Sequence, residues 1–190
     1  MDFFIITLIL HVCGQLAILK LRIKNIVVHP RGSSYAIGQI VKRHVHLIRL
    51  TNAIDDMFNI LLMWEIIGVS VVFCLVGYNV LMNSQDGFKI NFLIYFVFIL
   101  GAFLNLYSNY FVGDRLISES TGLCYAFYDC EWYNIPPQHA RNLLICMSRA
   151  QIPMVLTAGK FYVLSLENFT DIMKTAMAIV SVLRKTSMKN

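Results

Sequence analysis

Two apolar segments, each long enough to cross a lipid bilayer, constrain the fold of this chain more than any other feature. Residues 61–82 (LLMWEIIGVSVVFCLVGYNVLM) contain one charged residue, Glu65, and residues 90–112 (INFLIYFVFILGAFLNLYSNYFV) contain none. A spanning helix needs about 20 predominantly apolar residues. The intervening NSQDG, residues 83–87, is typical of a short turn. The sequence therefore predicts a transmembrane helical hairpin.

The composition agrees with a membrane protein and excludes several function classes. Hydrophobic residues make up 57% of the 190 residues, charged residues make up 14%, and the mean hydropathy is +0.63. Soluble domains are about 45–50% apolar, so a soluble protein, and with it a nucleic-acid-binding one, is not expected. The five cysteines have no C-x-x-C spacing, and His44 and His46 face different directions on a helix, so no metal site is expected. No cofactor motif is present.

The first sixty residues divide into an apolar and a basic part. Residues 3–19 reach the lower limit for a spanning helix, and we interpret them as the remnant of a span. The alternative, a signal peptide, is disfavoured because the segment opens with Asp2 and lacks an A-x-A-like cleavage site. Residues 20–49 carry Lys and Arg but no acidic residue, which indicates a cytoplasmic loop. Residues 20–60 are therefore predicted as a cytoplasmic loop followed by an amphipathic helix, with apolar residues at helical spacing: Ile37, Ile40, Val41, Val45 and Ile48.

Residues 113–151 combine charges with large aromatic side chains around the proline pair at 136–137. The charges place this region outside the bilayer, whereas its aromatic residues need burial. We predict a packed helical region here, with a separate short helix at 139–151 that ends before Pro153.

Residues 152–183 are predicted to form the last helix, longer than the roughly 20 residues needed to span. At about 100° per residue, four charged residues fall on one face, and Ala178, Ser181 and Val182 continue it. Because charges facing lipid are costly, such a polar stripe is a candidate pore lining. In the alternative, the charges pair with one another on a surface helix, Lys160 with Glu167 and Asp171 with Lys174. The four stripe residues are Lys160, Glu167, Asp171 and Lys174.

The C-terminal sequence RNLLICMSRAQIPMVLTAGKFYVLSLENFTDIMKTAMAIVSVLR, residues 141–184, resembles the last transmembrane region of insect odorant receptors. Upstream, the Tyr-x-x-x-Trp spacing of Tyr128 and Trp132 fits the same pattern. The pattern DFF, then Gln, then Leu over residues 2–19 resembles the inner part of the fourth span, so the resemblance covers essentially the whole chain. The matching C-terminal positions are Arg149, Pro153, the run LTAGKF at 156–161, the run LSL at 164–166, Phe169, Ile172 and Lys174.

The resemblance implies an all-α integral membrane fold, the C-terminal half of a seven-helix channel subunit. It assigns residues 3–19 to the end of span 4, 61–82 to span 5, 90–112 to span 6, 113–151 to cytosolic anchor helices and 152–183 to span 7. It implies an odorant-gated, non-selective cation channel in the plasma membrane of olfactory neuron dendrites. The implied partners are an odorant co-receptor in a heterotetramer, a small volatile ligand and membrane lipid.

Functional residues follow from the resemblance by position only. The gate is expected near the outer end of the last helix, at Val182 and Thr186, with Ser181 and Ala178 on the same stripe. One departure is the apolar run AMAIV at 176–180, where many relatives are rich in Ser and Tyr. The ligand-binding residues are expected on span 6 at Phe92, Tyr95, Phe96 and Ile99.

Two alternatives accompany this interpretation. A gustatory-type receptor of the same superfamily shares the architecture, although the TYhhhhhQF ending typical of that group is absent. A truncated, non-conducting fragment is the other, because the chain lacks the spans that complete the ligand pocket. An enzyme is not expected, because the chain has neither a G-x-S-x-G elbow nor paired histidine boxes.

Overall fold

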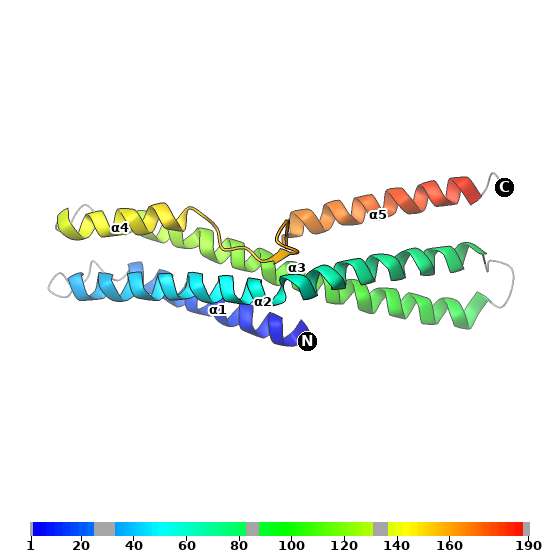
Figure 1. The fold of residues 1–190 in the computed structure, drawn as a ribbon, viewed down its shortest axis with the longest axis horizontal. Helices are drawn as coiled ribbons and strands as arrows, with labels where there is room; N and C mark the ends of the chain where they lie inside the picture. Colours follow the sequence, from blue (N-terminus) through cyan, green and yellow to red (C-terminus); the bar gives the residue numbers. More distant parts are fainter. Residues whose placement is uncertain (1, 25–32, 83–87, 131–136, 188–190) are drawn as a thin grey trace. The chain divides into compact units, whose positions relative to one another are not determined.

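The computed structural model describes residues 2–24, 33–82, 88–130 and 137–187. In chain order, the elements are the helices α1 (Asp2–Lys24), α2 (Ser33–Met82), α3 (Phe88–Asp129) and α4 (Pro137–Ala150), the strands β1 (Thr157–Ala158) and β2 (Tyr162–Val163), and the helix α5 (Leu166–Ser187). Figure 1 shows these elements along the chain. The prediction of an all-α membrane fold is confirmed, with one small β-hairpin added. The predicted turn at 83–87 and Trp132 lie outside the described residues.

The two central helices are longer than the predicted spans. Helix α2 has 50 residues, so the predicted cytoplasmic helix and span 5 are one continuous helix. Helix α3 has 42 residues and continues from predicted span 6 into the region 113–151. Neither boundary contains a proline that would end the helix. At 1.5 Å per residue, α2 measures about 75 Å, much more than the roughly 30 Å of hydrocarbon, so both helices extend beyond a bilayer.

Contacts group the residues into two compact units. Unit 1 comprises Met1–Phe58 and Val112–Leu156, and unit 2 comprises Asn59–Phe111 and Thr157–Asn190. Helices α2 and α3 each contribute to both units, whereas α1 and α4 belong to unit 1 and α5 belongs to unit 2. The boundaries on α2 and α3 lie within two residues of the predicted starts and ends of the spans, at 61 and 112.

Unit 1 packs with the repeat of a helical bundle. Buried residues recur alternately every three and four positions, an average of 3.5 that is typical of knobs-into-holes packing. The prediction for α2 is partly wrong, because Val45 is 40% exposed and Leu47 is buried in its place. The buried positions are Ile5, Ile9, Val12, Leu16, Leu19 and Ile23 in α1, Ile37, Ile40, His44, Leu47, Thr51, Ile54 and Phe58 in α2, Leu116, Ser120, Leu123 and Phe127 in α3, and Leu143, Cys146 and Ala150 in α4.

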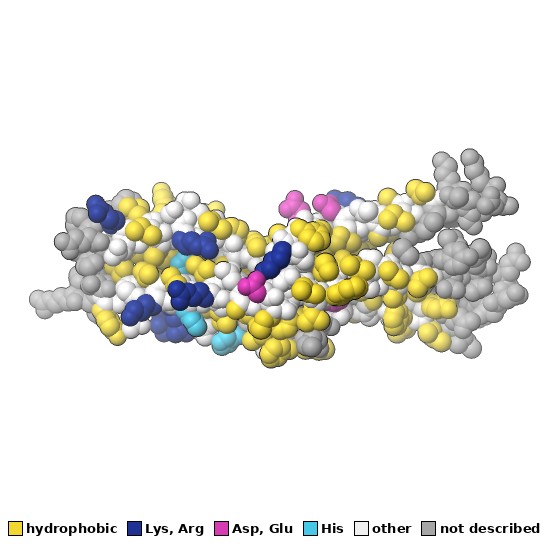
Figure 2. Space-filling model, in the orientation of Figure 1, with side chains coloured by type: hydrophobic (Ala, Val, Ile, Leu, Met, Phe, Trp, Pro, Cys, Tyr) yellow, Lys and Arg dark blue, Asp and Glu magenta, His cyan; other side chains and the backbone are white. Residues whose placement is uncertain are grey.

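Polar contacts also join the helices of unit 1. Lys20 of α1 forms a half-buried ion pair with Glu119 of α3. The backbone N–H of Met154 donates to the hydroxyl of Ser120 at 3.0 Å, which ties the segment after α4 to α3. On the outside, Figure 2 shows Lys and Arg side chains spread over the visible face of this unit.

Unit 2 exposes large apolar side chains on both of its long helices. Among the described residues of both units, three helical segments are long and apolar enough to cross a membrane: Phe3–Lys24 in unit 1, and Tyr35–Phe73 and Leu93–Asp129, which extend over both units. Because a soluble protein rarely exposes such a large apolar surface, these faces suit lipid or other subunits. The exposed side chains include Trp64, Ile67, Val71 and Leu75 of α2, and Leu93, Ile94, Phe96, Val97 and Phe98 of α3. The structure is thus that of a multi-pass membrane protein.

The prediction that residues 152–183 form one helix is wrong in its first half. Residues 157–163 form the β1–β2 hairpin, with Thr157 opposite Val163 and Ala158 opposite Tyr162, and α5 begins only at Leu166. Pro153 disfavours a helical residue before it, and Gly159 has a left-handed φ of 63° that a helix does not accommodate. Lys160 therefore lies in the hairpin turn and is not on the helix with the other stripe residues.

Candidate functional site

The β1–β2 hairpin docks on α2 through its turn. Gly159 and Lys160 both have left-handed φ values, 63° and 69°. The N–H of Gly159 donates to the backbone oxygen of Asn59 at 3.0 Å. A Cβ on Gly159 would lie only 2.9 Å from the Met63 sulfur. The backbone conformation thus favours glycine, and a larger residue would also have to displace the Met63 side chain.

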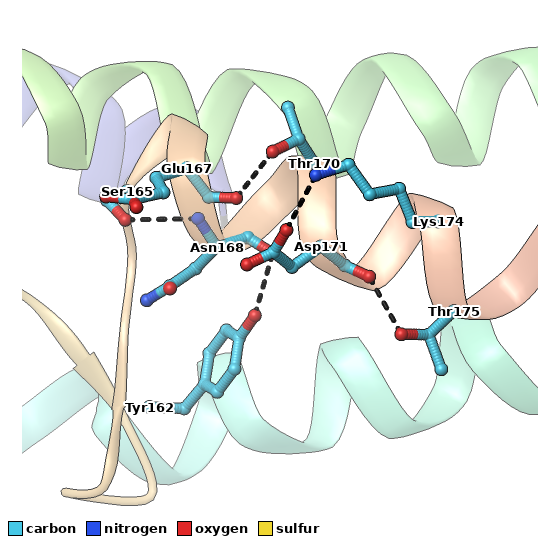
Figure 3. Close-up of polar contacts among 8 residues, drawn as sticks. All are labelled: Tyr162, Ser165, Glu167, Asn168, Thr170, Asp171, Lys174 and Thr175. Atoms are coloured by element: carbon cyan, nitrogen blue, oxygen red, sulfur yellow. Dashed lines mark hydrogen bonds and ion pairs between the residues drawn. The ribbon is translucent and has the colours of Figure 1, made fainter.

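Hydrogen bonds from the hairpin fix the first turn of α5 (Figure 3). The hydroxyl of Ser165 accepts the backbone N–H of Asn168 at 3.3 Å, as an N-cap does. The Asn168 side chain donates to the backbone oxygen of Val163 at 2.8 Å, and the Tyr162 hydroxyl donates to the backbone oxygen of Asn168 at 2.9 Å. The sequence LSLEN therefore sets where α5 starts and how its first turn is joined to the hairpin.

An aromatic cluster seats the same turn on α3. The ring of Phe169, which is 6% exposed, lies 5.5 Å from Phe103, 5.8 Å from Tyr107 and 5.3 Å from Tyr110, measured between ring centroids. Tyr110 also lies 6.5 Å from Tyr162 of the hairpin. Such edge-on and tilted aromatic contacts are favourable beyond the area that they bury. We call the three α3 residues, Phe103, Tyr107 and Tyr110, the aromatic seat.

The polar stripe on α5 lies opposite the packed face of that helix. Phe169 is buried, and Ile172, Met173 and Ala176 are half-buried. Glu167, Asp171 and Lys174 are exposed, and at 100° per residue they lie about 180° around the helix from those packed residues. Lys174 and Asp171 form an ion pair at 3.0 Å, with side chains that are 77% and 63% exposed. Of the two alternative pairings, that of Asp171 with Lys174 thus occurs, and the stripe still points away from the rest of unit 2.

The predicted gate residues continue this exposed face. Ala178 and Ser181 are exposed, and Val182 is 65% exposed. Thr186 belongs to α5, but its side chain is outside the described residues. Ser181 donates its hydroxyl hydrogen to the backbone oxygen of Met177 at 2.8 Å. That bond leaves the hydroxyl oxygen free to accept a hydrogen bond from water.

The predicted ligand residues lie on the part of α3 that belongs to unit 2. Tyr95 and Ile99 are half-buried and Phe96 is 56% exposed, while the Phe92 side chain is outside the described residues. Three of the four predicted residues thus present apolar surface that this chain covers only partly.

Sequence reasoning did not pair Glu65 of α2 with the two asparagines of α3 that it contacts. The Glu65 carboxylate accepts hydrogen bonds from the side-chain amide nitrogen of Asn105 at 3.1 Å and from that of Asn109 at 3.1 and 3.0 Å. Asn109 is only 3% exposed. The signal was present in the sequence, because a carboxylate within a spanning segment is expensive and needs a partner. The spacing alone does not indicate which helix supplies that partner.

Comparisons with known proteins agree with this architecture. The family model described as "7tm Odorant receptor" matches residues 1–177. Odorant receptor 2a of Drosophila melanogaster is 30% identical over 135 residues, covering 71% of this chain and 34% of that protein. Odorant receptor 13a of the same species is 27% identical over 93% of this chain and 46% of that protein. The odorant receptor coreceptor of Ooceraea biroi is 26% identical over 78% of this chain and 30% of that protein.

The fold is also that of a solved insect receptor. The olfactory receptor OR5 from Machilis hrabei in complex with eugenol superimposes with a TM-score of 0.83 at 17% identity, covering 97% of this chain and 47% of that chain. This chain thus spans less than half the length of the relatives that it matches. Because the family model covers most of its residues, the chain belongs to the seven-transmembrane odorant receptor family.

Proposed function

We propose that this chain acts as a ligand-tuning subunit of an odorant-gated, non-selective cation channel in the sense of smell. The observation that carries the proposal is the geometry of α5. Its polar stripe and the described gate residues Ala178, Ser181 and Val182 face away from the side that packs on the aromatic seat. A helix that is held on one side and polar on the other is suited to line a water-filled path at the centre of an assembly.

In this proposal the stripe and the gate have separate roles. Glu167, Asp171 and Lys174 keep the inner part of the path hydrated, and their mixed charges do not select strongly for one cation. Val182 supplies an apolar constriction that closes by dewetting, with Ala178, Ser181 and Thr186 beside it. By length and composition α5 is not among the spanning segments of the described residues, because it carries these charges. A helix that faces water on one side tolerates them.

The subunit is proposed to assemble with an odorant co-receptor as a heterotetramer in the plasma membrane of olfactory neuron dendrites. Similarity to co-receptors of Ooceraea biroi, Harpegnathos saltator and Anopheles gambiae supports an assembly of related subunits. The basic residues at 20–49 support a cytoplasmic position for that stretch. Membrane lipid contacts the exposed apolar faces of unit 2.

The proposed ligand is a small volatile organic molecule that contacts Phe92, Tyr95, Phe96 and Ile99. Aromatic rings with one hydroxyl provide apolar contact and a single orienting hydrogen bond, which suits a small ligand with one polar group. Segments outside this chain would complete the pocket.

Odorant-evoked current tests the proposal. The chain is expressed with a co-receptor, in parallel with a version extended upstream if the transcript supplies one, and cation current is recorded during exposure to a panel of volatile esters, alcohols and phenols. Current above that of the co-receptor alone supports a competent subunit. Current only from the extended version identifies the 190-residue chain as a non-conducting fragment, and no current from either version refutes the proposed function.

A further inference from the structure

The Glu65 cluster lies between the two helices on which α5 is seated. Three hydrogen bonds of 3.0 to 3.1 Å join the carboxylate on α2 to the Asn105 and Asn109 amides on α3. Asn109 contacts both carboxylate oxygens, so its amide group is held face to face with the acid. These bonds fix how far α3 can slide along α2 at this level. An isolated apolar contact would not fix that register, because apolar contacts are not directional.

The orientation of Asn109 shows that the carboxylate dominates the cluster. Among the described residues, Oδ1 of Asn109 is a buried acceptor without a hydrogen-bond partner. Leaving such a group unpaired is costly. The amide keeps this orientation because the opposite one would place its oxygen against the negatively charged carboxylate.

The segment that carries α5 is attached to both helices at once. Its hairpin is bonded to α2, where the N–H of Gly159 donates to the oxygen of Asn59. Its helical end rests on α3, where Phe169 contacts Phe103, Tyr107 and Tyr110. A slide of α3 along α2 would therefore move one attachment relative to the other and displace the first turn of α5.

The asparagines that contact Glu65 and the tyrosines that contact Phe169 lie on the same stretch of α3. Asn105 and Asn109 are four residues apart and point toward α2, while Tyr107 and Tyr110 lie between and just after them and point toward Phe169. A change in the carboxylate contacts is thus transmitted through the rigid helix to the aromatic seat within one turn.

We propose that Glu65 is a positioning residue for the pore helix: its carboxylate sets the register of α2 and α3, and that register sets the placement of the first turn of α5. The inference rests on the proposed function for its consequence, which is that the contacts of Glu65 determine how readily the channel opens. The placement of α5 itself is testable without any current.

Hydrogen exchange on the purified 190-residue chain in detergent micelles tests the placement. In Glu65→Gln, the negative charge is lost, so the charge-assisted hydrogen bonds from the Asn105 and Asn109 amides become weaker neutral ones, and an amide of α3 must turn to accept from the new NH₂ group. We expect exchange on the order of tenfold faster at the amides of the hairpin and first α5 turn, including Gly159 and Phe169. The double variant Glu65→Gln with Asn109→Asp exchanges the roles of acid and amide, and we expect it to restore exchange to within about twofold of the wild type.

A control separates positioning from a general loss of stability. Glu119→Gln removes the partner of Lys20 in unit 1, and we expect unchanged exchange in residues 157–172. Unchanged exchange at the hairpin in Glu65→Gln, equally fast exchange throughout α2 and α3, or no recovery in the double variant would each overturn the proposal.

Current recordings with the co-receptor and the same odorant panel then test the functional consequence. We expect Glu65→Gln to shift the half-maximal odorant concentration by at least about threefold at equal surface expression, and the double variant to reverse the shift. A conducting wild type with no shift in Glu65→Gln contradicts the role in gating. If the wild type and the upstream-extended version are both silent while exchange changes as expected, the proposed function fails and the placement of α5 by Glu65 stands.

Discussion

Truncating Phe169 tests whether the aromatic seat holds the pore helix. The ring is 6% exposed and contacts three aromatic rings at centroid distances of 5.3 to 5.8 Å. Burial of this kind makes Phe→Ala cost about 3–5 kcal/mol, whereas the volume-conserving Phe169→Leu should cost less than about 1.5 kcal/mol. For a chain of this size, each kcal/mol lowers the melting temperature by about 2–4 °C. Phe169→Ala should therefore lower it by at least about 6 °C.

The assay is thermal unfolding of the purified protein in detergent micelles, followed by the loss of the folded species in size-exclusion chromatography. Phe161→Ala is the matched control, because it removes the same kind of ring from the nearby hairpin turn, where the side chain is 79% exposed. Its expected effect is within about 0.5 kcal/mol. Equal losses for Phe169→Ala and Phe161→Ala would refute the reasoning, since burial on the aromatic seat would then contribute nothing.

Three further perturbations address the cap, the turn and a buried thiol. Ser165→Ala removes the acceptor of the Asn168 N–H and should lower the free energy of unfolding by about 1 kcal/mol in the same assay. Ser165→Thr keeps a hydroxyl and should be close to the wild type. An equal loss of stability in both variants would contradict the role of Ser165 as an N-cap. Gly159→Ala should lower the free energy of unfolding by at least about 1–2 kcal/mol, because φ at this position is 63°. Gly38→Ala, at an open position within α2, should instead raise the free energy of unfolding by about 0.5–1 kcal/mol. A less stable Gly38→Ala than Gly159→Ala would contradict this reasoning. In α4, burial raises the pKa of the Cys146 thiol, so the folded state favours the neutral form. The stability of the folded state should therefore decrease as the pH rises past the ordinary thiol pKa of about 8.5. Cys146→Ala should remove the contribution of this thiol to that decrease, as measured by melting temperatures over a series of pH values.

Local patterns predicted much of the architecture correctly. The apolar lengths of residues 61–82 and 90–112 predicted the helical hairpin because crossing a bilayer requires about 20 apolar residues whatever they pack against. The 100° periodicity placed Glu167, Asp171 and Lys174 on one exposed face of α5, since that relation depends only on helix geometry. The LTAGKF and LSL runs indicated the family through their resemblance alone.

Other features depended on which segments meet in the fold. Lys160 leaves the stripe because the Gly159 turn is bonded to Asn59, a residue one hundred positions earlier in the chain. In α2, Leu47 was buried instead of Val45 because a bundle with a 3.5-residue repeat buries a narrower face than an isolated helix suggests.

The sequence by itself determined that Glu65 is an acid within a spanning segment, which is costly wherever the chain goes. Only the tertiary structure decided that the Asn105 and Asn109 amides of α3 compensate that cost, and that the same stretch of α3 seats Phe169. The physical reason is that hydropathy and periodicity are sums over neighbours in sequence. Hydrogen bonds between α2 and α3 depend instead on the register of two helices, which is fixed only when both have packed.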